Sequence, residues 1–134
     1  MELAAAVGQP DAYAGEVPVA YVTVRQGAAI TAEALGAYAR QAVAERPAAP
    51  KAVRILERMP ETAVGKIFKP ALREDAAAHA ARRALAEAGL PECQVSALTD
   101  TQRGLVVRIR GLRNESAPAA AEALEAFSFA WERA

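Results

Sequence analysis

Two stretches near the start of the chain show the apolar patterns of β-strands. Residues 3–7 form a short apolar run that meets turn-forming residues at 8–11, which predicts a buried strand followed by a turn. Residues 16–24 are rich in Val, Tyr and Thr, and this composition predicts a second strand. Pro18, near its start, favours an edge strand or the beginning of a strand. Alternation puts four of its residues on one face: Val17, Val19, Tyr21 and Thr23.

The next segments change between helical and strand periodicity. Thr31 is a suitable N-cap for a helix that prolines end. The apolar positions of this helix recur at three- and four-residue spacing and comprise Leu35, Tyr38, Ala39, Ala42 and Val43. A third strand is predicted at 51–56. A further helix is predicted over 70–88, with Pro70 in its first turn and Gly89 as its C-cap.

The last third of the chain has a different pattern of apolar and polar residues. Residues 93–97 and 105–110 alternate apolar with polar or small side chains around a polar turn, which predicts a β-hairpin. Ser116 is placed to cap a helix that runs to about residue 126. Three alternating aromatic residues then predict a final strand: Phe127, Phe129 and Trp131.

Together these elements predict an α+β chain in two parts. Residues 1–75 are expected to form a small antiparallel sheet with flanking helices. Residues 76–134 are expected to add a helix and an appendage of β-hairpin, helix and strand. Hydrophobic residues make up 53% of the 134 residues, but many are alanines, so we expect helices with small-residue faces rather than one large core.

Charge and cysteine content exclude several classes of protein. Lys+Arg and Asp+Glu both number 16, and this balance argues against a dedicated nucleic-acid binder. No stretch approaches the roughly 18–20 apolar residues of a membrane span, and no signal peptide is visible. Cys93 is the single cysteine, which leaves no internal disulfide and favours a cytoplasmic location.

The predicted strand at residues 3–7 lies close to the start of the sequence. Because a core strand rarely opens a domain, we expect further sequence before this strand in the native gene.

The segment Pro60-Glu-Thr-Ala-Val-Gly-Lys-Ile-Phe-Lys69 is the most informative part of the chain. Its Gly-Lys pair invites comparison with a phosphate-binding P-loop. That motif needs a glycine where Pro60 stands and a Ser or Thr where Ile67 stands. The segment therefore is not a P-loop.

The same segment resembles the C-terminal signature of the adenylate-forming superfamily, Pro-x-Thr-x-x-Gly-Lys-Ile-x-Lys. That superfamily includes acyl-CoA synthetases, luciferases and the adenylation domains of peptide synthetases. Residues 5–11, followed after a short gap by Glu16-Val17 and a Val/Tyr-rich strand, are similar to the strands before that lysine in acyl-CoA synthetases. The resemblance covers about residues 3–75.

The resemblance implies a role for Lys66 as the catalytic lysine. Its ammonium would stabilise the negative charge that develops when a carboxylate attacks the α-phosphate of ATP. It also implies Gly65, Lys69, Arg73 and Glu16 as candidates for substrate or nucleotide contacts, although solvated surface charge is the simpler interpretation of the last three. ATP, Mg²⁺ and CoA are the implied substrates and cofactors, and the domain is expected to rotate between two half-reactions.

The chain departs from the superfamily pattern in ways that limit what it does alone. The hinge motif and the large N-terminal adenylation domain, which supplies the ATP, acyl and magnesium sites, are absent from this sequence. We therefore expect a C-terminal domain of an acyl-CoA synthetase acting on a carboxylic, and specifically a fatty, acid, inactive without its partner domain. Val64 stands where the superfamily often has a small or polar residue, and its branching stiffens the turn.

Two other functions remain open at this point. One is a non-catalytic binding or regulatory module of the same fold, for which Lys66 would be dispensable. The other is an adenylation domain that loads a carrier protein instead of CoA. No metal-ligand pattern is present. Cys93 is expected to be a buried structural thiol, and His79 a solvated side chain.

Overall fold

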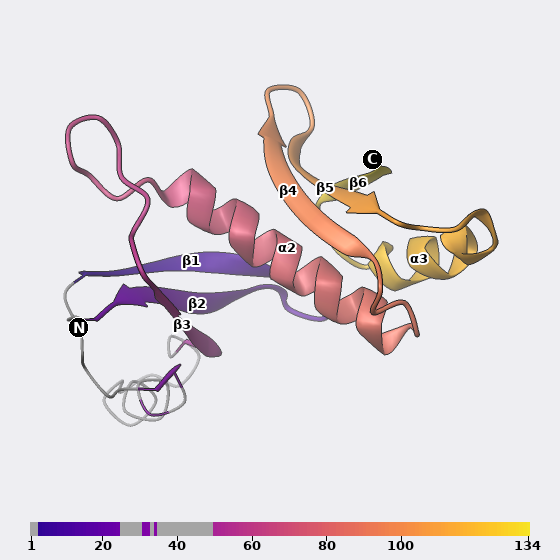
Figure 1. The fold of residues 1–134 in the computed structure, drawn as a ribbon, viewed down its shortest axis with the longest axis horizontal. Coiled ribbons are helices and arrows are strands. Elements are labelled where there is room, and N and C mark those ends of the chain that lie inside the picture. The colour runs from indigo at the N-terminus through magenta and orange to yellow at the C-terminus, as the bar shows by residue number, and fades with distance from the viewer. Residues whose placement is uncertain (1–2, 25–30, 33, 35–49) are drawn as a thin grey trace. The chain divides into compact units, whose positions relative to one another are not determined.

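The computed structural model describes residues 3–24, 31–32, 34 and 50–134, and it confirms an α+β fold (Figure 1). The chain divides into two compact units, which we describe separately. Unit 1 comprises Met1–Gly8 and Val17–Leu72, and unit 2 comprises Gln9–Glu16 and Arg73–Ala134. Of the helix predicted after Thr31, the structure confirms the cap: the Thr31 hydroxyl accepts a hydrogen bond from Ala34 N at 3.1 Å. The predicted apolar face of that helix lies outside the described residues.

The first sheet contains three strands in the order β1-β2-β3, formed by Leu3–Asp11, Gly15–Thr23 and Ala52–Leu56. The β1–β2 pair is a hairpin, because only three residues join the two strands. β2 and β3 run parallel, in a register that pairs Val19 with Ala52 and Thr23 with Leu56. The expectation of an antiparallel sheet is corrected here to a mixed one, since residues 24–51 are long enough for the crossover that a parallel pair needs.

The two prolines of the first hairpin correct two further expectations. β1 continues through Pro10 to Asp11, where a turn was predicted. Because β1 lies at the edge of its sheet, a residue without an N–H is tolerated there. β2 is the central strand, so Pro18 does not mark an edge. Pro18 lies just before the β3 ladder and takes part through its carbonyl, which accepts a hydrogen bond from Lys51 N at 2.8 Å.

The buried polar side chains that the structure describes in unit 1 are hydrogen-bonded. Tyr21 is fully buried, and its hydroxyl accepts a hydrogen bond from the Arg54 guanidinium at 3.0 Å. The same guanidinium lies 5.5 Å from the centre of the Tyr21 ring, within range of a cation–π interaction. The hydroxyl of buried Thr23 accepts a hydrogen bond from Leu3 N at 3.1 Å. The predicted inward face of β2 therefore carries its polar atoms into the core without leaving them unsatisfied.

Helix α2, Lys69–Glu87, confirms the predicted helix and its C-cap. Gly89 has a φ of +84°, and its N–H bonds to Ala86 O at 3.1 Å. Leu90 N bonds to Leu85 O at 2.8 Å. These two bonds form a Schellman motif, in which the left-handed residue lets the chain reverse and brings Leu90 beside Leu85.

The second sheet, in the order β4-β5-β6, is formed by Gln94–Asp100, Gly104–Arg110 and Ala130–Arg133. β4 and β5 form the predicted hairpin and are antiparallel, whereas β5 and β6 are parallel. The chain returns between them through the 3₁₀-helix η2, Asn114–Ser116, and helix α3, Ala117–Leu124. Ser116 precedes α3 as predicted, but its side chain makes no capping bond because its backbone is already helical.

The strand predicted from the three aromatic residues begins later than expected. β6 starts at Ala130, so only Trp131 lies within it. Phe127 and Phe129 lie in the connection before it, and their rings stack with centroids 5.2 Å apart. Alternation in this segment therefore reflects aromatic stacking next to the core as well as strand structure.

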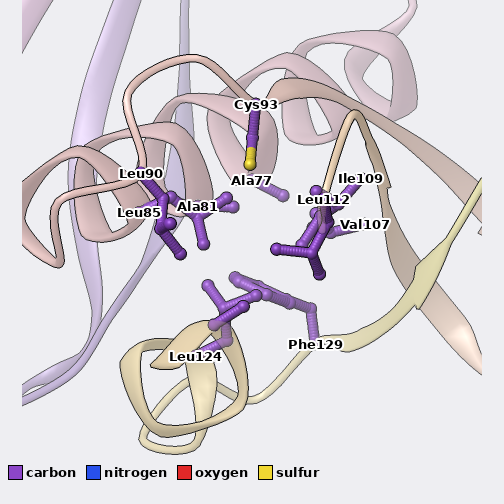
Figure 2. Packing of buried hydrophobic residues seen from close by; sticks show 11 residues of the cluster. Ala77, Ala81, Leu85, Leu90, Cys93, Val107, Ile109, Leu112, Leu124 and Phe129 are labelled. Carbon is purple, nitrogen blue, oxygen red and sulfur yellow. The ribbon is translucent and has the colours of Figure 1, made fainter. Parts of the chain in front are cut away.

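The hydrophobic core of unit 2 lies between α2, β5 and α3 (Figure 2). Small side chains of α2 face branched side chains of the sheet, and the sulfur of Cys93 points into the cluster. The buried members are Ala77, Ala81, Leu85, Leu90, Cys93, Val107, Ile109, Leu112, Ala120, Leu124 and Phe129. Alanines on one face of α2 allow the helix to approach the sheet closely, which is how an alanine-rich sequence forms a compact core.

Candidate functional site

A loop connects β3 to α2 (Figure 1), and Lys66 lies within this loop. Two backbone hydrogen bonds close this loop: Phe68 N donates to Pro60 O at 2.8 Å, and Thr62 N donates to Lys66 O at 2.7 Å. Pro60, at the base of the loop, has no backbone N–H. The loop does not need one there, because the hydrogen bond from Phe68 uses the Pro60 carbonyl. The lysine is therefore attached to a hydrogen-bonded ladder and not to an irregular loop.

A tight turn at Thr62 sets the position of Lys66. Gly65 N donates to Thr62 O at 3.0 Å, and Lys66 N donates to the Thr62 hydroxyl at 3.2 Å. Gly65 has a φ of +81°, whereas Ala63 and Val64 have negative φ values. A turn of this kind, followed by one left-handed residue, matches a three-residue hairpin loop closed by a glycine bulge. The turn explains why glycine immediately precedes the lysine.

The Lys66 side chain is exposed. Within residues 3–24, 31–32, 34 and 50–134, no carboxylate forms an ion pair with its ammonium group. An ammonium that no described carboxylate neutralises is available to an external anion. The geometry therefore suits Lys66 to electrostatic stabilisation of negative charge.

The other predicted contacts are Gly65, Lys69, Arg73 and Glu16. Gly65 shapes the turn, and Lys69 is the first residue of α2, with its side chain exposed. Arg73 and Glu16 are also exposed, and both belong to unit 2. The predicted roles of these residues as substrate contacts remain predictions.

Sequence reasoning did not anticipate the part that Thr62 has in the site. Its N–H, carbonyl and hydroxyl each make one of the hydrogen bonds that hold the turn. A threonine four residues before the lysine can form such a bond from its side chain to a backbone N–H, so the signal was present in the motif. Thr62 is therefore a positioning residue for Lys66.

The described part of the chain contains no group of His, Cys, Asp and Glu side chains that could hold a metal ion. His79, predicted to be solvated, is partly exposed and lies 3.4 Å from the Asp75 carboxylate. Cys93 is buried as predicted. Two effects raise the pKa of its thiol: the larger is burial, and the smaller is the negative charge of the nearby Glu92 carboxylate. A raised pKa disfavours the nucleophilic thiolate, which agrees with a structural role.

The arginines beside β5 differ in their pairing. Arg103 bonds to Glu132 at 3.0 Å and lies 3.5 Å from Asp100, which raises the pKa of its guanidinium. Arg108 and Arg110 are exposed and line a hollow of about 310 Å³ on unit 2. Arg103 therefore has structural partners. Arg108 and Arg110 form no ion pair within the described residues.

The fold and the loop define a class of protein: an α+β domain that presents Lys66 on a hydrogen-bonded hairpin. Residues 2–66 match the family of AMP-binding enzyme C-terminal domains, as the resemblance of the Pro60–Lys69 segment predicted. The match ends at Lys66 itself.

Several known proteins are similar to this chain. Marinolic acid–CoA ligase from Pseudoalteromonas sp. (strain SANK 73390) is 49% identical over 73 residues, which is 54% of this chain and 11% of that protein. Long-chain-fatty-acid–CoA ligase from Bacillus subtilis (strain 168) is 41% identical over 68 residues, 51% of this chain and 12% of that protein. The chain thus spans only a small part of the length of these relatives.

A solved structure, the amide bond synthetase McbA from Marinactinospora thermotolerans, is 35% identical to this chain. The likeness covers 54% of this chain and 15% of that one, with a TM-score of 0.47. Among the described residues, no helix has the length and apolar character needed to cross a membrane.

Proposed function

We propose that this chain is the C-terminal domain of an AMP-forming acid–CoA ligase. In the first half-reaction, a carboxylate oxygen attacks the α-phosphorus of ATP, forms an acyl-adenylate and releases pyrophosphate. In the second, the thiol of CoA attacks the acyl carbon and releases AMP. The proposal is supported by the family match of residues 2–66 and by relatives that are named CoA ligases.

Lys66 would serve the first half-reaction. Negative charge builds up on the phosphoryl and acyl oxygens in the transition state, and a compact ammonium close to both stabilises it. The observation that carries this role is the exposed Lys66, unneutralised by the described residues and held by the Thr62 turn. Lys69, Arg73 and Glu16 are proposed as secondary contacts to substrate or nucleotide.

The ligands of the reaction would be held mainly by a large N-terminal adenylation domain, the proposed partner of this chain. That domain would bind ATP with Mg²⁺, the acid and most of the CoA, so the chain alone is expected to be inactive. A fatty acid is the proposed substrate class, supported by the name of the Bacillus subtilis relative. A cytoplasmic location is proposed from the single, buried cysteine.

The test uses the complete gene product that contains this chain. Acid-dependent exchange of pyrophosphate into ATP reports the first half-reaction, and thioester formation from a supplied acyl-adenylate reports the second. We expect Lys66→Ala to slow exchange by roughly 10²–10³-fold, the usual loss for one such electrostatic contact. Thioester formation should change much less. Lys51→Ala is the matched control, because Lys51 is an exposed lysine outside the hairpin.

The outcomes separate this function from its alternatives. Exchange at the wild-type rate in Lys66→Ala would refute the catalytic role and favour a binding or regulatory module. Loss of exchange, together with acyl transfer to a carrier protein and not to CoA, would assign the chain to a carrier-loading enzyme. Acid-dependent exchange by the 134-residue chain alone would contradict the proposed need for a partner domain.

A further inference from the structure

Large apolar side chains are exposed on both sides of Lys66. Among the described residues, the exposed large hydrophobic side chains are Leu3 at 39%, Tyr13 at 100%, Val64 at 80% and Phe68 at 43% of their full accessible area. Val64 and Phe68 stand two residues before and two residues after the lysine. A single exposed apolar side chain needs no explanation, but two that bracket a cation with no ion pair to a described residue define a local surface. We call Val64 and Phe68 the apolar collar.

The hairpin holds the collar in place without burying it. Val64 lies in the turn that Gly65 N closes on Thr62 O, and Phe68 is tied through its N–H to Pro60 O. Between them, Ile67 forms a β-bridge with Glu61 and is only partly exposed. Side chains alternate along such extended backbone, so Lys66 and Phe68 leave the hairpin on one side and Ile67 on the other. The cation and Phe68 thus leave the hairpin on one side, and Val64 stands in the turn at the tip of the same hairpin.

This arrangement has an electrostatic consequence. In water, the field of an exposed ammonium is strongly screened, and its attraction for an anion a few ångströms away is weak. The same pair interacts far more strongly where water is excluded. Apolar side chains around the ammonium would exclude water as soon as they met an apolar surface, without offering the cation a competing carboxylate.

We propose that the apolar collar docks against an apolar rim around the anionic reaction centre of the large AMP-binding domain, and so positions Lys66 and removes water from it. The inference rests on the proposed function. The choice of partner follows from the length of the relatives, since the match covers only 11% and 12% of two CoA ligases. Val64 and Phe68 are accordingly positioning residues that act through Lys66.

The experiment compares collar variants with equally exposed controls in the complete gene product. The collar variants are Val64→Ala and Phe68→Ala, and the controls are Tyr13→Ala and Leu3→Ala. Pyrophosphate exchange is measured at saturating ATP and acid. We expect Val64→Ala to slow exchange about tenfold, the size expected for losing one or two buried methylene groups. Phe68→Ala removes a whole ring and should slow exchange more, and the KM for ATP should be unchanged in both variants. The controls should keep the wild-type rate, and Val64→Ile should preserve it.

A second readout follows the docking directly. An amine-modifying reagent should label Lys66 more slowly once ATP and acid are added to the wild-type enzyme, because the docked ammonium is shielded. We expect this protection to fall about tenfold in the collar variants. The labelling rate without substrates should stay at the wild-type value. A changed rate without substrates would overturn the docking role, because it would show that the collar residues are needed to fold the hairpin.

The remaining outcomes separate the inference from the function on which it rests. If Lys66→Ala abolishes exchange while both collar variants exchange and protect Lys66 like the wild type, the collar has no docking role and the proposed function stands. If Lys66→Ala itself exchanges at the wild-type rate, both are overturned. If the controls lose as much activity as the collar variants, exposure alone is responsible and the inference fails.

Discussion

Gly65→Ala isolates the contribution of backbone conformation to the site. Gly65 has a φ of +81°, and a Cβ built on it would have no heavy atom within 4 Å. The substitution therefore introduces no steric clash with neighbouring groups, and its cost comes from the backbone alone. For an L-residue, the left-handed conformation costs about 1–2 kcal/mol. The turn that places Lys66 should be disfavoured by that amount.

A cost of this size should appear in activity more than in stability. One to two kcal/mol corresponds to roughly a 5–30-fold fall in the population of the correct turn. In the complete gene product, we expect pyrophosphate exchange to fall by a similar factor. The hairpin tip is exposed, so an altered turn can relax into water and the melting temperature should change little. Asparagine tolerates the left-handed region better than alanine, so Gly65→Asn should recover part of the lost activity.

Gly89→Ala is the matched control for this prediction. Gly89 has a φ of +84° and also has no heavy atom within 4 Å of a Cβ built on it, but it closes the Schellman motif at the end of α2. There the strain cannot relax without releasing buried Leu90, so the melting temperature should fall by roughly 3–8 °C. Exchange should be unaffected while the protein remains folded. Full activity of Gly65→Ala, or an equal loss in both variants, would refute the link between this turn and Lys66.

Two further predictions concern stability. Leu85 is fully buried in the unit 2 core, so Leu85→Ala should lower the free energy of unfolding by about 2–5 kcal/mol in urea titrations. Leu3 is exposed, so Leu3→Ala should change this free energy by less than about 0.5 kcal/mol. Hydrogen bonds from Gln102 N and Arg103 N hold the pKa of Asp100 below its usual 3.8, so its stabilisation is present above that value and is lost as the pH falls through the folded pKa. Asp100→Asn keeps an acceptor oxygen and should remove this part of the acid sensitivity of the urea midpoint; an unchanged acid profile would contradict the assignment.

Much of the local structure could be predicted because it depends on neighbouring residues. The Val/Tyr-rich composition located β2, and Pro70 and Gly89 marked the two ends of α2. The motif from Pro60 to Lys69 indicated a family, and the match of residues 2–66 confirmed it. What the motif could not reveal is the geometry of the loop, in which Thr62 makes three hydrogen bonds.

The sequence by itself determined which faces of the strands are apolar, where the helices end and which lysine is the candidate for catalysis. Only the tertiary structure decided that β2 is central and runs parallel to β3, and that Val64 and Phe68 remain exposed beside Lys66. The physical reason is that side-chain alternation has the same period of two in parallel and antiparallel strands. Exposure depends on which distant segments cover a residue, and that information lies in the packing of the chain and not in its local pattern.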